Sequence, residues 1–336
     1  IITCPCALGL AVPVTHVMAA NRLFREGILM RDGSALERLA EADTVFFDKT
    51  GTLTSDELRL ADLSALPLDH SSVLRSLASR SRHPVARAIA RDCPEVPPTD
   101  LTDVTEFAGF GIEAVWDGKR VRLGRGDWAR EIAGTEPPED GASTAFAIEN
   151  EDSYAFRLTS DLKPDTAQMI DEIVRRGYAT AIVSGDHESN VAVIARKIGI
   201  ERWYAGLTPQ GKIAKIEGSG ADRKVLMVGD GLNDAPSLAA AHVSMAPASA
   251  TDVSRASADF VYTRPSLLAV PFAMQLSKDE NRIVRQNFAI AILYNCIAVP
   301  LAIMGHVTPL VAAIAMSLSS IIVVTNSRRL SAFGWF

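Results

Sequence analysis

The sequence predicts an α/β protein, in which a parallel-sheet domain carries an inserted α+β domain and is flanked by transmembrane helices. Three apolar stretches each run into a polar turn that holds an aspartate, at Asp48, Asp186 and Asp230. Helical patterns lie between the later stretches, and alternation of strands and helices is typical of a parallel sheet. About 100 residues with a different sequence pattern separate the first two stretches. Apolar blocks of about membrane-spanning length lie at both ends of the chain.

The composition of the chain argues against several classes of protein. A formal net charge of −6 over 336 residues gives no basic surface for nucleic acid, so we expect no nucleic-acid partner. The hydrophobic content of 48% is high for a wholly soluble protein. Four cysteines in a chain of this length do not resemble a disulfide framework. The sequence opens inside an apolar segment without an initiator Met, and we interpret it as a fragment of a longer protein.

The first apolar block covers residues 1–20 and is followed by Arg22 and Arg25. About 20 residues suffice to cross a hydrocarbon core of about 30 Å. Because basic residues favour the cytoplasmic side, the domains after this helix are expected in the cytoplasm. A buried helix of a soluble protein is the alternative, but prolines at two interior positions disfavour it.

The motif Cys4-Pro5-Cys6 is the sharpest feature of this block. Residues two apart on an intact helix point about 200° away from each other, so both thiolates reach one ion only where the helix is unwound. Pro5 removes the hydrogen bond that would hold that turn together, and irregular backbone at membrane depth is tolerated where it lines an ion site. The motif therefore predicts a metal site, with two buried structural cysteines as the alternative.

The second apolar block consists of two runs, Phe288–Met304 and Val307–Thr325, joined by the turn Gly305-His306. Each run is close to membrane-spanning length. Basic residues precede and follow the pair while the turn has none, which predicts that both ends are cytoplasmic and that the turn is outside. A buried helical hairpin of a soluble protein is the alternative. The flanking basic residues are Lys278, Arg282, Arg285, Arg328 and Arg329.

The inserted stretch combines helical and antiparallel-strand patterns. Asp117-Gly118 between two alternating stretches is a strong hairpin signal, and a second hairpin is expected within residues 144–158. Helical spacing covers residues 71–90, with an interruption at His83-Pro84. Together these patterns predict a compact α+β module between Asp48 and the later strands.

The strand Val45–Phe47 delivers Asp48 to its end, and a tight polar turn with a lysine, two threonines and a glycine follows. A carboxylate held at a strand tip beside a lysine and backbone N–H groups is a candidate nucleophile for a phosphoryl group. A single aspartate after a strand is more often a helix N-cap. Three of them at the carboxyl ends of neighbouring parallel strands favour a ligand site instead.

The string Asp-Lys-Thr-Gly-Thr-Leu-Thr at residues 48–54 resembles the phosphorylation signature of P-type ATPases, which belong to the haloacid-dehalogenase superfamily. The resemblance implies a haloacid-dehalogenase-like fold for the sheet domain and an aspartyl-phosphate at Asp48. It also implies that Lys49, Thr50 and Thr52 serve the phosphoryl transfer, with Thr50 contributing to Mg²⁺ and phosphate contacts.

Two later motifs extend the resemblance. Ser184-Gly185-Asp186 stands where P-type ATPases usually have Thr-Gly-Asp, and the serine keeps the hydroxyl. Lys212, at the end of the motif Thr-Pro-Gln-Gly-Lys, looks like the lysine that neutralises the transferring phosphoryl group. An isolated motif of this kind would otherwise be a turn with a surface lysine.

The stretch Gly-Asp-Gly-Leu-Asn-Asp-Ala-Pro matches the hinge motif of the same family. By this resemblance, Asp230 and Asp234 hold Mg²⁺ and Asn233 contacts the phosphate. The chemistry agrees, because a dianionic phosphoryl group next to carboxylates needs both a divalent cation and a lysine.

In the inserted module, His83-Pro84 and the turn Gly109-Phe110-Gly111 resemble the ATP-holding features of the heavy-metal branch, type IB. The resemblance implies that His83 and Pro84 orient the nucleotide and that Gly109 and Gly111 let the backbone approach it. Without the other motifs, each would be a weak signal for a structural turn.

The same module departs from the branch at three positions. Arg82 stands where the branch often has Glu, Ala78 where a Glu is common, and Arg125 where Asn is usual. Arg82 and Arg125 could instead engage phosphates. The Arg82 variant resembles the branch that supplies copper for cytochrome oxidase assembly.

Three segments are expected to hold the transported metal. Cys4 and Cys6 offer sulfur ligands, which suit Cu⁺ or Zn²⁺. The thioether of Met316 beside two thiolates favours Cu⁺, whereas Zn²⁺ would recruit a carboxylate or His, and residues 288–325 contain no Asp, Glu or Lys. This set resembles the copper subgroup and lacks the acidic and lysine pattern of the zinc/cadmium subgroup. The candidate copper ligands are Cys4, Cys6, Tyr294, Asn295, Met316 and Ser319.

The expected function is ATP-driven transport of Cu⁺ out of the cytoplasm through an aspartyl-phosphate. ATP and Mg²⁺ are the expected cofactors, and the lipid bilayer, the copper ion and a cytoplasmic copper chaperone are the expected partners. A zinc/cadmium-exporting pump, a soluble haloacid-dehalogenase-type phosphatase and a non-transporting metal-binding membrane protein are the alternatives. The family's actuator domain and earlier helices do not occur in the sequence, so we expect that these residues alone do not transport.

The resemblance also sets the expected domain boundaries. They are a transmembrane helix with the metal motif (1–21), a connector with the first part of the phosphorylation domain (22–60), the nucleotide-binding domain (61–158), the second part of the phosphorylation domain (159–277), a transmembrane helix pair (278–327) and a cytoplasmic tail (328–336).

Overall fold

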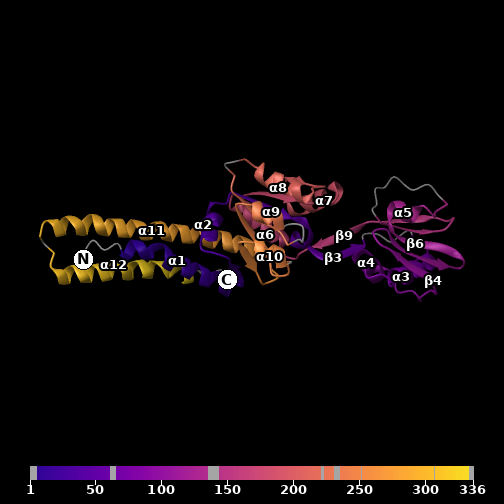
Figure 1. The fold of residues 1–336 in the computed structure, drawn as a ribbon, viewed down its shortest axis with the longest axis horizontal. Helices are drawn as coiled ribbons and strands as arrows, with labels where there is room; N and C mark the ends of the chain where they lie inside the picture. Colours follow the sequence, from indigo (N-terminus) through magenta and orange to yellow (C-terminus); the bar gives the residue numbers. More distant parts are fainter. Residues whose placement is uncertain are drawn as a thin grey trace. The chain divides into compact units, whose positions relative to one another are not determined.

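A computed structural model describes residues 6–60, 66–134, 144–220, 223–230, 235–250, 252–305 and 307–332 (Figure 1). The chain divides into two compact units, which are considered separately below. The main unit consists of residues Ile1–Leu53 and Lys163–Phe336, and the inserted unit consists of residues Thr54–Leu162.

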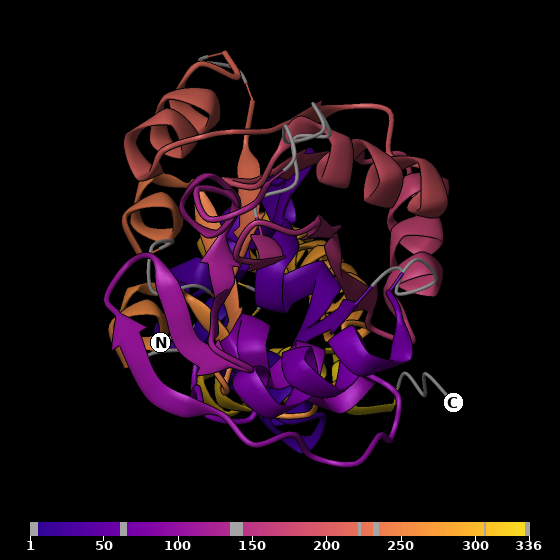
Figure 2. The ribbon, with the colours of Figure 1, turned by 90° about the vertical axis from the view of Figure 1, so that its right-hand side faces the viewer.

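The main unit contains a seven-stranded sheet among its described residues (Figures 1 and 2). Its strands are parallel except for the edge pair of β1 and β14, which is antiparallel. β2 is buried at every position, because it lies between β12 and β10. The order is β1 (Ile28–Met30), β14 (Phe260–Tyr262), β13 (Val243–Pro247), β12 (Val225–Val228), β2 (Thr44–Asp48), β10 (Ala179–Val183) and β11 (Trp203–Tyr204).

Helices follow the strands as the sequence pattern predicted. Ile216 of α8 and Leu238 of α9 pack on Phe46 and Val183 and cover one face of the sheet. α7 ends at Gly199, which adopts a left-handed conformation with φ of 73°. The helices are α2 (Ser34–Glu41), α6 (Thr166–Arg175), α7 (Glu188–Ile198), α8 (Pro209–Glu217), α9 (Ala235–Ala240) and α10 (Asp252–Ser257). The parallel-sheet prediction is confirmed.

The inserted unit is an α+β module, as predicted. Asp117 and Gly118 have φ of 47° and 74°, so they form the expected tight hairpin turn between β5 and β6. Cys93 lies in the core, and burial raises the pKa of its thiol to about 11. The elements are β3 (Thr54–Leu60), α3 (Leu68–Ala78), α4 (Pro84–Asp92), β4 (Thr102–Phe107), β5 (Gly111–Trp116), β6 (Lys119–Arg125), α5 (Gly126–Arg130), β7 (Thr144–Ile148), β8 (Ser153–Phe156) and β9 (Leu158–Leu162).

Three further helices of the main unit are long and apolar enough to cross a membrane. They are α1 (Cys6–Arg25), α11 (Ala269–Ile303) and α12 (Pro309–Ser327), and a short helix, α13 (Arg329–Ala332), follows. α1 continues through Pro13 without a break. The unwound turn predicted at Pro5 lies outside the described residues.

α11 starts much earlier than the apolar run that predicted it. The helix begins at Ala269 instead of Phe288 and is 35 residues, or about 52 Å, long. Its first half is largely buried within the main unit, including Phe272, Leu276 and Ile283. One continuous helix therefore connects the region of the sheet with the apolar end of the main unit.

Candidate functional site

Three neighbouring strands end at the same edge of the main sheet. β10 pairs with β2 so that Val183 lies opposite Asp48, and β12 pairs with β2 so that Val228 lies opposite Phe47. The residues that follow these strands therefore leave the sheet side by side. Ligands of open parallel sheets bind at such an edge.

Asp48 and Lys212 form a buried ion pair at this edge. The Nζ atom of Lys212 lies 2.6 Å from Oδ1 of Asp48, and the two residues are 7% and 4% exposed. The first turn of α8 supplies Lys212, and the hydroxyl of the N-cap Thr208 accepts a hydrogen bond from the N–H of Gly211 at 3.1 Å. Pro209 at the first helical position fixes where α8 begins. In this pair an ammonium group compensates the charge of a buried carboxylate.

Lys49 pairs with Asp186 beside the first pair. The hydroxyl of Ser184 accepts a hydrogen bond from the N–H of Asp186 at 3.1 Å, and Oδ1 of Asp186 accepts one from the N–H of His187 at 2.7 Å. Burial opposes ionisation, but the hydrogen bond and charge of Lys49 hold the pKa of Asp186 below its ordinary value. Asp186 is therefore fixed as an ionised partner of Lys49. Gly185, between them, lies against the carbonyl of Leu207.

Gly51 allows the carboxylate of Asp230 to approach the turn Lys49–Leu53. Its φ is 73°, and a Cβ atom built there would lie 1.9 Å from Oδ2 of Asp230. The hydroxyl of Thr52 is buried and has no hydrogen-bond partner among the described residues. Oxygen ligands from Asp48 and Asp230, with an unsatisfied hydroxyl beside them, fit a Mg²⁺ ion and a phosphoryl group. Thr50 is exposed on the same turn.

We expect Gly51→Ala to raise the Mg²⁺ concentration for half-maximal phosphorylation at least about tenfold, because the added methyl displaces Asp230 and the left-handed backbone costs about 1–2 kcal/mol. A Mg²⁺ titration of phosphoenzyme formation measures this. Gly199→Ala is the matched control, since Gly199 has the same φ of 73° but no atom within 4 Å of its Cβ position. Equal half-saturation in the two variants would contradict the steric argument.

Lys163 belongs to this site, although the sequence analysis did not single it out. Its Nζ atom donates a hydrogen bond to the carbonyl of Gly51. The carbonyl of Leu53 accepts bonds from the N–H of Lys163 at 3.0 Å and from the hydroxyl of Thr166 at 2.9 Å. Nothing in the sequence around Lys163 indicates that it contacts a carbonyl group more than 100 positions upstream. Only the fold identifies Lys163 as part of the site.

Several predicted residues cannot be placed. Asn233, Asp234 and Cys4 lie outside the described residues, and the side chain of Cys6 is not described either. Their roles as phosphate, Mg²⁺ and metal ligands remain predictions.

In the inserted unit, His83 caps helix α4. Its Nδ1 atom accepts a hydrogen bond from the N–H of Val85 at 3.3 Å, and Pro84 occupies the first helical position. Because the accepting nitrogen carries no proton, a neutral ring bears its proton on Nε2, where it can be donated to a ligand. The hydroxyl of Ser81 donates to Oε1 of Glu106 at 2.6 Å, which ties this loop to the end of β4 and the glycine turn after it.

The two glycines of that turn have different surroundings. Gly109 has a φ of 79° and no atom within 4 Å of its Cβ position, so this point is open to a ligand. A Cβ atom on Gly111 would lie 2.3 Å from the carbonyl oxygen of Leu123 and 2.6 Å from Cα of Gly124. Gly111 is therefore required where β5 and β6 approach closely, whatever its part in nucleotide binding.

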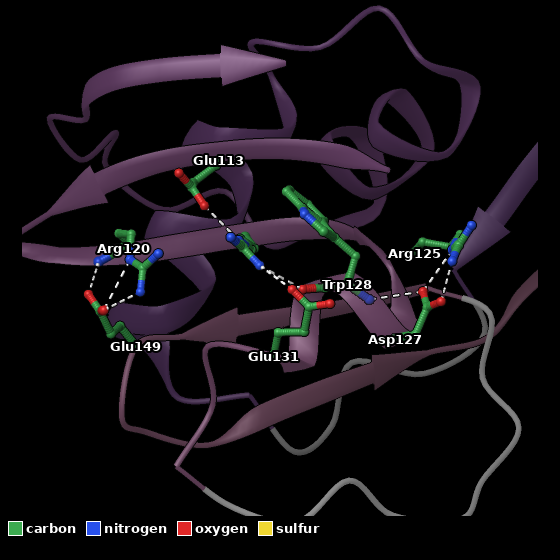
Figure 3. A network of polar contacts seen from close by, with 8 residues as sticks. Glu113, Arg120, Arg125, Asp127, Trp128, Glu131 and Glu149 are labelled. Atoms are coloured by element: carbon green, nitrogen blue, oxygen red, sulfur yellow. Dashed lines mark hydrogen bonds and ion pairs between the residues drawn. The ribbon is translucent and has the colours of Figure 1, made fainter. Parts of the chain in front are cut away.

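The two arginines that depart from the family pattern also differ. The guanidinium of Arg125 is paired with Asp127 and lies 5.2 Å from the centre of the Phe110 ring (Figure 3). Arg82 is exposed, and the structure records no side-chain partner for it among the described residues. Of the two, Arg82 is the one available to a phosphate group.

A further arginine holds the strands behind the glycine turn. Nε of Arg122 lies 2.6 Å from Oε2 of Glu113, and its Nη1 donates to the carbonyl of Trp128 at 2.9 Å (Figure 3). The same guanidinium lies 4.5 Å from the centre of the Trp128 ring. These contacts fix α5 on β5 and β6, so the turn is presented by a rigid support.

The three long helices meet at an apolar cluster close to the predicted ligands on α11 and α12. α1 starts at Cys6, while Asn295 lies on α11 and Ser319 on α12, each one turn from a shared apolar cluster. Residues four apart share a helix face, so these two side chains are on the faces directed toward the start of α1. The cluster consists of Ala7, Ala11, Ala291 and Val323, with Phe288 against it.

The predicted ligands on α11 and α12 are partly buried. Oδ1 of Asn295 is buried without a hydrogen-bond partner among the described residues, which is unusual for an amide oxygen. The carbonyl of Met316 accepts a bond from the hydroxyl of Ser319 at 2.8 Å, so that hydroxyl oxygen retains its lone pairs. Tyr294 and Met316 are half-buried. An unsatisfied buried oxygen is a suitable ligand for a cation.

A family model described as haloacid dehalogenase-like hydrolase matches residues 42–242, the part of the chain that contains the strand-end site. The chain belongs to the haloacid-dehalogenase-like hydrolases. This confirms the fold predicted for the sheet domain, and the matched residues include Asp48 at the end of β2.

Among curated proteins, the chain is 48% identical to the nitrogen fixation protein FixI of Rhizobium leguminosarum bv. viciae, over 99% of this chain and 44% of that protein. It is 35% identical to a copper-exporting P-type ATPase of Mycobacterium tuberculosis, over 99% of this chain and 46% of that protein. The chain thus spans less than half the length of the curated relatives it matches.

Two solved structures resemble the chain, one over nearly all of its length and the other over about three quarters of it. A zinc-transporting PIB-type ATPase in the E2.Pi state has a TM-score of 0.84 at 28% identity, covering 98% of this chain and 56% of that one. The catalytic domain of the CPx-ATPase CopB-B has a TM-score of 0.67 at 25% identity, covering 76% of this chain and 98% of that one. The resemblance to heavy-metal P-type ATPases is therefore confirmed in both sequence and fold.

Proposed function

We propose that the chain contains the phosphorylation, nucleotide-binding and metal-carrying parts of an ATP-driven pump that moves Cu⁺ out of the cytoplasm. The buried pair of Asp48 and Lys212 carries this proposal. A carboxylate 2.6 Å from a lysine at the carboxyl edge of a parallel sheet suits an aspartyl-phosphate intermediate.

In the proposed reaction, a carboxylate oxygen of Asp48 forms a bond to the γ-phosphorus of ATP. The bond from this phosphorus to the oxygen bridging to the β-phosphate breaks, and ADP leaves. Lys212 compensates the negative charge on the transferring group, and Lys49, held by Asp186, adds positive charge to the same edge. Mg²⁺ held by Asp48 and Asp230 would supply further charge neutralisation.

The inserted unit is proposed to deliver the nucleotide. Nε2–H of His83 is available to donate to ATP, and the exposed backbone of Gly109 allows close approach. The free guanidinium of Arg82, next to His83, supplies positive charge for a phosphate.

Copper is favoured as the transported ion by the donor set on the three long helices. Sulfur from the Cys4/Cys6 motif and from Met316 suits a soft monovalent ion, and no carboxylate or lysine occurs in residues 288–325. The unpartnered oxygen of Asn295 adds a neutral ligand. A zinc-exporting pump is the second candidate, because the solved structure with a TM-score of 0.84 belongs to a zinc-transporting protein.

Metal stimulation of phosphoenzyme formation tests the choice of ion. The full-length protein is assayed in membranes under reducing conditions. Cu⁺ is expected to raise the amount of phosphoenzyme formed from labelled ATP at least about fivefold over a sample that contains a metal chelator, since ion occupancy and phosphorylation are coupled. Zn²⁺ is expected to raise it less than about twofold. Replacing both Cys4 and Cys6 by Ser should remove the Cu⁺ stimulation. Stimulation by Zn²⁺ and not by Cu⁺ would refute copper transport.

A further inference from the structure

A carboxyl group is buried between α1 and α11 at a distance from both the phosphorylation edge and the metal-ligand segments. Glu280 of α11 is 1% exposed, and its Oε1 lies 3.2 Å from Nε2 of His16 on α1. Along α11, Glu280 is about 22 Å from Asn295. It lies two turns before the apolar run that starts at Phe288, near the end of α11 that leaves the sheet.

The pair is surrounded by few other charges. Glu37 of α2 is 3.9 Å from Nε2 of His16, but this glutamate is largely exposed. Gly33, at the start of α2, packs against the His16 ring. On α11, Lys278 points to the ring of Tyr178, and Asp279 accepts a hydrogen bond from Gln275. Glu280 and Glu37 therefore both face His16, and Glu280 is the buried one of the two carboxyl groups.

Two turns further along α11, the same helices are joined by an uncharged network. The amide of Asn287 donates to the hydroxyls of Thr15 at 3.2 Å and of Ser327 at 3.0 Å, and all three residues are fully buried. This network links α1, α11 and α12, the helices that carry the candidate metal ligands. It joins the helices through uncharged groups alone.

A buried ionisable pair is a poor source of stability, because removing two charged groups from water costs several kcal/mol in general. Its better-attested use is to fix one register between elements. A shift of one helix past another by a single turn, about 5.4 Å, would separate His16 from Glu280. The contact is thus present in one arrangement of α1 on α11 and absent in a shifted one.

We propose that His16 and Glu280 are positioning residues that latch the metal-carrying helix α1 to α11, and so couple the phosphorylation domain to the metal site. The pair can couple the two sites because it joins a helix from each of them. α11 follows β14 of the sheet, whereas α1 begins at the Cys4/Cys6 motif. This inference rests on the proposed ATP-driven transport. Protonation of Glu280 weakens the latch, since the negative charge facing His16 is lost.

The test is the number of metal ions transported per ATP hydrolysed by the full-length protein in sealed vesicles. Glu280→Gln keeps the shape of the side chain and removes its charge. We expect this variant to keep metal-stimulated phosphorylation but to lower the transport ratio by about fivefold or more, the usual scale of coupling between sites. Asp279→Asn is the matched control on the same helix, because Asp279 has no recorded contact with α1. The number of metal ions that Asp279→Asn transports per ATP hydrolysed should equal that of the native protein.

Two further readouts separate a latch from general damage. The ratio of the native protein should fall as the pH is lowered and Glu280 takes up a proton, whereas that of Glu280→Gln should be low and independent of pH. The double variant His16→Gln with Glu280→Gln should be no worse than Glu280→Gln alone, because the two changes remove one interaction.

A native ratio and pH profile in Glu280→Gln, an equal loss in Asp279→Asn, or additive losses in the double variant would each overturn the latch. Absence of any metal-stimulated ATP hydrolysis in the native protein would instead refute the proposed function, and the latch with it.

Discussion

Asp48→Asn is expected to abolish phosphorylation from ATP, with a loss of about 10³-fold or more, because a carboxamide cannot replace the nucleophile. The side chain keeps its size at the end of β2, where it is 4% exposed. Lys212 loses its charged partner, which costs about 1–3 kcal/mol of unfolding free energy. The effect is measured as the amount of acid-stable radioactive phosphate bound to the protein after a brief reaction with labelled ATP. Circular dichroism checks that the variant is folded.

The control for this variant is Asp186→Asn. Asp186 is paired with Lys49 and accepts bonds from His187 and Asn190, so it supports the site without being positioned as the nucleophile. We expect a reduced but detectable label in this variant. Label retained in Asp48→Asn and lost in Asp186→Asn would reverse the assignment.

Lys212→Met is expected to slow phosphorylation by about 100- to 1,000-fold, because the charge that develops on the transferring phosphoryl group is no longer compensated. The substitution also leaves the carboxylate of Asp48 buried without its cation, so a lower unfolding temperature should accompany the slower reaction. Single-turnover phosphorylation at saturating ATP measures the rate separately from nucleotide binding.

Lys215→Met serves as the matched control for this prediction. Lys215 lies one turn further along α8, is exposed and contacts the ring of Tyr204 with its ammonium group 4.6 Å from the ring centre. It should phosphorylate at the native rate. Lys212→Arg, which keeps the charge with a larger head group, should fall between the two. A native rate in Lys212→Met would remove Lys212 from the proposed mechanism.

Much of the main unit could be predicted from local pattern alone. The strand Ala179–Val183 and the helix Glu188–Ile198 follow the predicted alternation of strands and helices, because apolar periodicity and the terminating Gly199 act within a few residues of the chain. The convergence of the strand ends followed from parallel pairing, since register fixes which residues leave the sheet together.

Long-range features could not be predicted in the same way. The bond from Lys163 to the carbonyl of Gly51 and the pair of His16 with Glu280 join residues that no periodicity relates. The true start of α11 was missed because its first half mixes apolar residues with polar and charged ones, so its composition differs from that of the apolar run after it. Local composition identified the membrane run but not the helix that contains it.

In the inserted unit, the two glycines of one family motif have different structural surroundings. Gly109 is open and free to meet a ligand, whereas Gly111 is fixed by the contact of its backbone with Leu123 and Gly124. Arg125, which replaces the usual Asn, is engaged by Asp127 and Phe110. These distinctions depend on cross-strand packing and were not visible in the spacing of the residues.

Identification of the phosphorylated residue tests the central claim most directly. Hydroxylamine converts an aspartyl-phosphate into a stable hydroxamate, which mass spectrometry can assign to one residue of the full-length protein. After reaction with ATP, Mg²⁺ and Cu⁺, we expect the hydroxamate at Asp48 and its absence when ATP is omitted. Modification at Asp186 or Asp230 instead, or no ATP-dependent modification at all, would contradict the account.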